Sequence, residues 1–168
     1  MIPYSTGGPT GALLLTDFSE ARDPGWFVVN DNVMGGRSAG GFRIANGALV
    51  FSGVTNTSGG GFSSIRSEPR LPSLAGRSRI NLFAHGDGRR YVLRLEQDDG
   101  IAYWADFAPP VDAPAVVSVP LAVFRPRFRG RWLDGPPLDA SRIVALGFMC
   151  YDGLDGPFRL EVSRIEAL

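Results

Sequence analysis

The chain consists of short apolar runs separated by clusters of glycine, proline, aspartate and asparagine. With 22 Gly and 13 Pro among 168 residues, turns are frequent and long helices are disfavoured. Within the runs, apolar side chains recur at every second position, which is the period of a β-strand. The pattern therefore predicts an all-β fold, namely an antiparallel β-sandwich or jelly roll.

We expect strands over short segments that cover most of the chain. They are 13–18, 26–30, 42–45, 48–52, 61–66, 77–84, 91–97, 101–107, 115–119, 143–151 and 158–165. Asn46-Gly47 predicts a tight hairpin, because both residues tolerate a positive φ. Short helical turns are expected near 71–75 and 121–124. No repeat or linker interrupts the pattern, so we expect a single domain over residues 1–168, with 1–11 as a flexible extension.

The composition excludes several classes of function. The 17 basic residues, all Arg, are balanced by 17 acidic ones, and this argues against a nucleic-acid partner. One His and one Cys exclude zinc ribbons and redox dithiols. The apolar runs are too short for membrane insertion, and the N-terminus lacks a signal or transit pattern, so we expect a cytoplasmic protein. We expect no metal, no cofactor and no catalytic residues, since no nucleophile–base set is evident.

Three polar strings rich in glycine are candidates for a site. Asn30-Asp31-Asn32-Val33-Met34-Gly35-Gly36-Arg37-Ser38 follows a strand and forms either a polar pocket or a glycine turn that lets backbones pack closely. The Gly59–Arg66 and Gly86–Tyr91 strings match no phosphate-binding motif and suggest turns or bulges. From these strings we expect one ligand-facing or loop-organising group, made of Asn30, Asp31, Arg37, Ser38, Arg66, Asp87, Arg89 and Tyr91.

A second candidate lies on the outer face of the two strands around Asp98-Asp99-Gly100. If these strands form a hairpin, then Arg94, Glu96, Trp104 and Asp106 project to the same side. An aromatic platform with charged neighbours suits a sugar, whereas a cross-strand ladder of ion pairs is the alternative. A glycosidase carboxylate pair is a third interpretation, but Arg94 would keep both acids charged.

An arginine-rich string lies near residue 130. Arg125, Arg127, Arg129 and Arg131 occupy alternate positions, so in an extended strand they would share one side. Such a row suits phosphate, an acidic partner or single-stranded nucleic acid, and the alternative is a solvated edge paired with nearby acids.

In order along the chain, these strings resemble the complex I intermediate-associated protein family. The resemblance rests on Asn30–Ser38, Phe51-Ser52-Gly53, Gly60–Arg66, Gly86–Tyr91, Phe124–Arg131, Leu146-Gly147-Phe148 and Gly156–Glu161. It implies a galactose-binding-like jelly roll. The best-known member is a mitochondrial chaperone-like factor for assembly of respiratory complex I, and this chain looks like a free-standing bacterial relative.

The resemblance implies a non-enzymatic binding or assembly domain. Its expected partner is a protein, such as a respiratory-complex assembly intermediate, or a small polar ligand. A carbohydrate-binding module that uses the face of Arg94, Glu96, Trp104 and Asp106 is the alternative.

Overall fold

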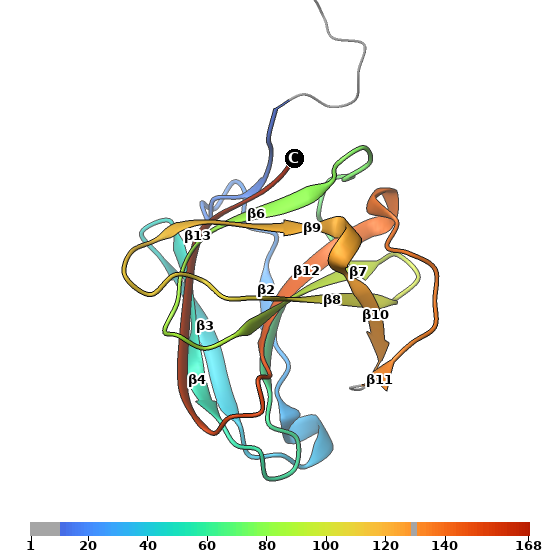
Figure 1. The fold of residues 1–168 in the computed structure, drawn as a ribbon. Helices are drawn as coiled ribbons and strands as arrows, with labels where there is room; N and C mark the ends of the chain where they lie inside the picture. The colour runs from blue at the N-terminus through green and yellow to red at the C-terminus, as the bar shows by residue number, and fades with distance from the viewer. Residues whose placement is uncertain (1–10, 129–130) are drawn as a thin grey trace, which may run out of the picture.

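The computed structural model describes residues 11–128 and 131–168, which form two antiparallel β-sheets packed face to face (Figure 1). The all-β sandwich predicted from the sequence is confirmed. The expected flexible extension lies, apart from Gly11, outside the described residues.

The first sheet has six strands in the order β3-β4-β13-β6-β9, and β1 pairs with β13 beside this path. The strands are β1 Leu13–Thr16, β3 Ala39–Ala45, β4 Ala48–Thr55, β6 Arg79–His85, β9 Ala115–Pro120 and β13 Gly156–Ala167. The long strand β13 is the central strand of this sheet: its first half pairs with β4 on one side and its second half with β6 on the other.

The second sheet has seven strands in the order β11-β10-β8-β7-β12-β5-β2. The strands are β2 Trp26–Val28, β5 Ser63–Ser67, β7 Tyr91–Gln97, β8 Ala102–Phe107, β10 Arg125–Phe128, β11 Arg131–Trp132 and β12 Ile143–Cys150. Three short 3-10 turns complete the described elements: η1 Asp31–Met34, η2 Leu121–Val123 and η3 Ala140–Arg142. The expected turn near 121–124 is thus confirmed, whereas 71–75 contains no helical turn.

The core lies between the two sheets and follows the period-two pattern. Tyr91, Leu93 and Leu95 of β7 are fully buried in it, as the sequence predicts. From the first sheet, Phe51 and Phe158 meet with ring centroids 4.8 Å apart. Because alternate residues point inward, the intervening side chains of each strand lie on the outer face of its sheet.

Turn residues fix the register where the sequence predicts a hairpin. Asn46 and Gly47 have φ values of 55° and 71° between β3 and β4. A two-residue turn of this kind needs a positive φ at both positions, which Asn and Gly tolerate. The register that results pairs Ala45 with Ala48.

The arginine-rich string does not continue as one extended run. Strand β10 ends at Phe128 and the chain returns as β11, with Arg127 opposite Trp132. The guanidinium groups of Arg125 and Arg127 both lie 4.4 Å from the Trp132 ring centroid. Arg131 lies in β11, the antiparallel partner of β10, so the single extended strand that would place all four arginines on one side is not formed, and Arg129 lies outside the described residues.

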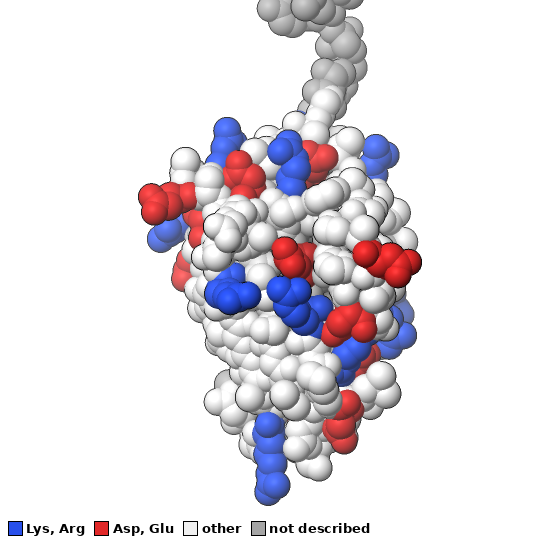
Figure 2. All heavy atoms as spheres, turned by 90° about the vertical axis from the view of Figure 1, so that its left-hand side faces the viewer, with Lys and Arg blue, Asp and Glu red and all other residues white. Residues whose placement is uncertain are grey.

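Charges of both signs intermingle on the face that lies on the left in Figure 1, so no field of one sign forms there (Figure 2). On β13, Arg159 pairs with Glu161 and Arg164 with Glu166, at 3.3 and 3.0 Å. In the described part of the chain, no helix has the length and apolar character needed to cross a bilayer.

Candidate binding site

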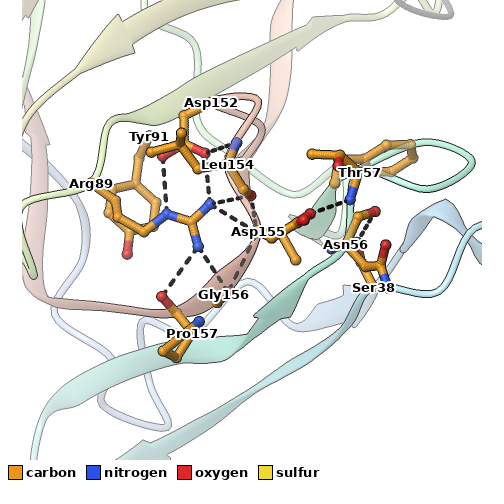
Figure 3. A network of polar contacts seen from close by, with 12 residues as sticks. Ser38, Asn56, Thr57, Arg89, Tyr91, Asp152, Leu154, Asp155, Gly156 and Pro157 are labelled. Atoms are coloured by element: carbon orange, nitrogen blue, oxygen red, sulfur yellow. Dashed lines mark hydrogen bonds and ion pairs between the residues drawn. The ribbon is translucent and has the colours of Figure 1, made fainter.

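Arg89 lies between β6 and β7, and its guanidinium group binds several groups of the protein itself (Figure 3). Its Nε and Nη2 atoms donate to the two carboxylate oxygens of Asp152, at 3.0 and 2.6 Å. The guanidinium also donates to the Thr55 hydroxyl and to backbone carbonyls in the 154–157 segment. Arg89 therefore fastens the loop between β12 and β13 to strand β4.

The electrostatics of this pair match its geometry. The hydrogen bond that Arg89 donates to Asp152 raises the pKa of Arg89 above its ordinary value. Burial on its own would raise the pKa of Asp152, but hydrogen bonds from Arg89 and from the Leu154 amide lower it overall. Both side chains are largely shielded from solvent, at 11% and 5% exposed, so the charged pair is a fixed part of the fold.

Asp87 and Tyr91 organise the turn before β7. The Asp87 carboxylate accepts hydrogen bonds from the Tyr91 hydroxyl at 3.0 Å and from the Arg159 amide at 2.7 Å. Burial raises the pKa of Tyr91, and the nearby charge of Asp87 raises it further. The two side chains join the turn to β13.

Asp31 joins the Asn30–Ser38 string to the Gly59–Arg66 string. It is fully buried, and its carboxylate accepts hydrogen bonds from the amides of Ser38, Gly61 and Phe62 at 2.9, 2.8 and 3.2 Å. Gly36 packs against it so closely that an added Cβ would lie 2.3 Å from the Asp31 carboxyl carbon. This explains why the Gly-Gly pair follows the aspartate.

Asn30 and Ser38 extend the same connection. Asn30 donates to the Gly40 carbonyl at 3.1 Å and accepts from the Ser63 hydroxyl at 2.6 Å. The Ser38 hydroxyl accepts from the Asn56 amide at 2.9 Å. Arg37 is exposed and forms no hydrogen bond or ion pair with the described residues.

Six of the eight predicted residues thus direct their polar atoms at the protein's own loops and turns. They are Asn30, Asp31, Ser38, Asp87, Arg89 and Tyr91. Arg66 is different, because it lines a cavity of roughly 690 Å³ on the outer face of the seven-stranded sheet. The structure therefore separates Arg66 from the group with which the sequence placed it.

The cavity gathers side chains from several strands of the sheet. Arg94 and Trp104, two residues of the second predicted group, line it. The other lining residues are Val29, Gly60, Phe62, Arg66, Asp99, Gly100, Ile101, Ala102, Arg127, Phe128, Leu133, Met149 and Tyr151. A smaller neighbouring cavity shares Gly60, Arg127 and Tyr151 and adds Arg90 and Asp106. We call the two cavities together the sheet-face groove.

Trp104 does not form the open platform expected from the sequence. Its side chain packs with Val92 and Met149, and the residue is only 8% exposed. The Arg127 guanidinium lies over its ring at 4.5 Å, and Tyr151 meets it edge-on at 6.0 Å. Arg127 also lies over the Tyr151 ring, at 5.5 Å. Tyr151 is partly exposed, and the most exposed aromatic residues along the groove are Phe128 and Trp132, at 60% and 46%.

Glu96 and Asp106, the acids of the second predicted group, each have an arginine neighbour. Glu96 pairs with Arg94 at 3.0 Å, and Asp106 lies 3.5 Å from Arg90. The Asp106 side chain is 58% exposed, so this pair is a weak surface interaction. The Arg94–Glu96 pair lies within β7, and Asp106 pairs with Arg90 outside the predicted group, so these residues do not form the cross-strand ladder considered as an alternative.

Arg66 forms no such ion pair, although the charge of Glu96 partly offsets the repulsion from Arg94. Its side chain makes no hydrogen bond or ion pair with the described residues, and its Nε atom is buried. Burial and the repulsion of Arg94 lower the pKa of Arg66 to about 10. A guanidinium without an acidic partner, set in a cavity wall, is suited to bind an anion.

Sequence reasoning missed the contribution of β12 to the groove. Met149 and Tyr151 line the groove, while Leu146, Phe148 and Cys150 face the core. The alternation of this segment was the available signal, but its outer residues are apolar or small and looked like further core. In the described chain, no group of three His, Cys, Asp or Glu residues could hold a metal ion.

Solved carbohydrate-binding modules share this fold. A family 11 module from Clostridium thermocellum, solved in complex with a β-1,3-1,4-mixed-linked tetrasaccharide, superposes with a TM-score of 0.68 at 17% identity. The match covers 96% of this chain and 97% of that chain. A family 29 module, CBM29-2, superposes with a TM-score of 0.56 at 9% identity, and the match covers 95% of this chain and 92% of that chain. At these identities the likeness shows the fold alone.

Two sequence comparisons add to this picture. The family model described as Complex I intermediate-associated protein 30 (CIA30) matches residues 16–162. An uncharacterised protein of Schizosaccharomyces pombe, C9E9.15, is 31% identical over 78 residues, or 44% of this chain. That match spans 36% of the length of the yeast protein.

Proposed function

Since the chain belongs to the complex I intermediate-associated protein 30 family, and its fold is that of carbohydrate-binding modules, we propose that it is a non-catalytic binding module. Its ligand occupies the sheet-face groove and is polar. The group of Asn30, Asp31, Ser38, Asp87, Arg89 and Tyr91 serves this function indirectly, by holding the loops beside the groove.

The observation that carries the proposal is the groove itself. Arg66 and Arg94 present charged groups from the sheet, while Tyr151 and Met149 provide apolar surface. A concave site with apolar walls and a few fixed polar groups is the usual form of a small-molecule site. The sugar-binding alternative gains support from the family 11 module with its bound tetrasaccharide.

A binding measurement by NMR tests this proposal. The mixed-linked tetrasaccharide is titrated into the labelled chain, and we expect shifts confined to the groove, including the Trp104 indole signal. The variant Tyr151→Ala should weaken binding. Phe83→Ala is the matched control, because Phe83 is an exposed aromatic residue of β6 in the other sheet. Shifts centred on the six-stranded sheet would contradict the groove as the site.

Assembly of respiratory complex I is the second candidate function, and the family match over residues 16–162 favours it. In this case the chain binds a protein partner. We expect immobilised chain to retain complex I subunits from solubilised membranes of its source. Retention that is unchanged in Tyr151→Ala would assign the partner to another surface, and the absence of any complex I subunit would exclude the assembly role.

A further inference from the structure

A row of opposed residues crosses the seven-stranded sheet at the centre of the groove. Gly147 of β12 is paired with Arg94 of β7 on one side and with Arg66 of β5 on the other. Arg94 is paired in turn with Trp104 of β8. Directly opposed residues of antiparallel strands project to the same face. Arg94 and Arg66 therefore stand on either side of a position that has no side chain.

Gly147 creates the space between the two arginines. An added Cβ there would lie 2.6 Å from the Ile65 carbonyl oxygen and 3.3 Å from Cγ of Arg66. The aliphatic stem of Arg66 thus passes close to the glycine. Since neighbouring strands are about 4.8 Å apart, the two arginine Cα atoms are separated by roughly 10 Å. This span allows both guanidinium groups to reach one small group between them.

The charges around this space do not balance. The two acids at this end of the groove already have partners: Glu96 pairs with Arg94, and Asp99 with Arg142 at 3.3 Å. Arg94 uses one N–H on Glu96, and Arg66 uses none of its side-chain donors. The chain as a whole is neutral, so the positive excess here is local.

We propose that the sheet-face groove binds an acidic ligand, and that its carboxylate lies above Gly147 between Arg66 and Arg94. A planar guanidinium matches a planar carboxylate through two parallel N–H···O bonds. Tyr151 and Phe62 line the same groove four residues along the chain from Gly147 and Arg66, so they suit a ligand whose rings extend along the groove from this position. A chain of sugar acids combines the two features. This inference rests on the proposed function, because it names the ligand class of the same groove.

The test compares three tetrasaccharides of different charge, together with a simple anion, by calorimetry and NMR. The probes are tetragalacturonate, its fully methyl-esterified form, the neutral mixed-linked tetrasaccharide and inorganic phosphate. We expect tetragalacturonate to bind with shifts at Arg66, Gly147 and Tyr151, and its methyl ester to bind at least about tenfold more weakly.

Two variants complete the test. Arg66→Gln should weaken tetragalacturonate binding by at least about tenfold. Arg43→Gln removes the same charge from exposed β3 in the other sheet and should leave binding unchanged. Thermal unfolding of both variants verifies that they are folded. Arg94→Gln serves as the second variant of the site and should weaken the same ligand.

The outcomes separate this inference from the proposed function. If the neutral tetrasaccharide or the methyl ester binds in the groove as tightly as the acid, the carboxylate site is wrong and the binding module stands. If Arg43→Gln weakened tetragalacturonate binding as much as Arg66→Gln, the ligand would be held by general charge attraction and not by a defined site, and this would overturn the inference. Tight binding of phosphate alone would also overturn it. If no probe binds at millimolar concentration, both proposals fail for sugar ligands.

Discussion

The carboxylate of Asp31 accepts a hydrogen bond of 2.8 Å from the amide of Gly61, a residue thirty positions further along the chain. This contact joins η1 to the loop before β5. Because β5 carries Arg66, the buried aspartate also fixes the strand that forms one wall of the groove.

Asp31→Asn is expected to destabilise the fold. An amide in place of the carboxylate directs an N–H group at backbone donors and loses charge-assisted hydrogen bonds, at a cost of about 2–3 kcal/mol. The free energy of unfolding in urea measures the loss. Asp112→Asn, at an exposed position, is the control and should change stability by less than about 0.5 kcal/mol. Equal stability of the two variants would contradict the structural role.

Arg89→Gln should be costly for a related reason. It leaves the Asp152 carboxylate buried without its cation, and breaking a buried pair costs about 3 kcal/mol or more. Arg159→Gln is the matched control, because its pair with Glu161 is largely exposed and contributes below about 1 kcal/mol. Denaturant unfolding measures the free energy of unfolding of both variants. Similar losses of stability would contradict the structural role of Arg89.

Acid should unfold the protein in part through Asp152. Its native pKa lies below the ordinary value of 3.8, so its contribution to stability is complete above that value. The contribution is lost as the pH falls through the lowered native pKa, because the unfolded state binds the proton first. The free energy of unfolding, measured in urea at a series of acidic pH values, should therefore fall less steeply with decreasing pH in Asp152→Asn than in the parent chain. Parallel profiles would contradict the pKa shift.

Cys150 should be inert in the folded protein. The thiol is fully buried, and burial raises its pKa to about 12, so little thiolate exists near pH 8. We expect an aromatic disulfide reagent to label it only after unfolding in urea, with the rate of labelling following the unfolded fraction. Rapid labelling of the native chain would show that the strand end at Cys150 opens readily.

The fold was predictable where a strand shows its period in its own sequence. In β7, the alternation of Leu93 and Leu95 with Arg94 assigns core and surface, because a strand has only two faces. Strands β10 and β11 were missed, since the arginines there alternate with Pro126, Phe128 and Gly130, which do not form a regular apolar face. Their hairpin is held instead by stacking of Arg127 on aromatic rings.

The site was less predictable, because the same polar residue types serve loops and ligands. Asp31 and Arg89 looked like candidates for ligand contact, yet their partners are groups of the protein itself that are distant in sequence: backbone amides for Asp31, and the Asp152 carboxylate and backbone carbonyls for Arg89. Only the path of the chain decides whether such a side chain turns inward. Arg66 remains in the groove because β5 pairs with β12, which no local pattern specifies.

Gly147→Ala tests the centre of the groove directly. The new methyl group would lie 2.6 Å from the Ile65 carbonyl oxygen, so β5 and β12 must separate locally, at a cost of about 1–3 kcal/mol. Gly41→Ala in β3 is the matched control: nothing lies within 4 Å of its added Cβ, so stability should hold or rise slightly. Since the methyl group also fills the space between Arg66 and Arg94, ligand binding in the groove should fall while binding by Gly41→Ala is unchanged. A Gly147→Ala variant with full stability would mean that the two strands are not in the close register on which the groove depends.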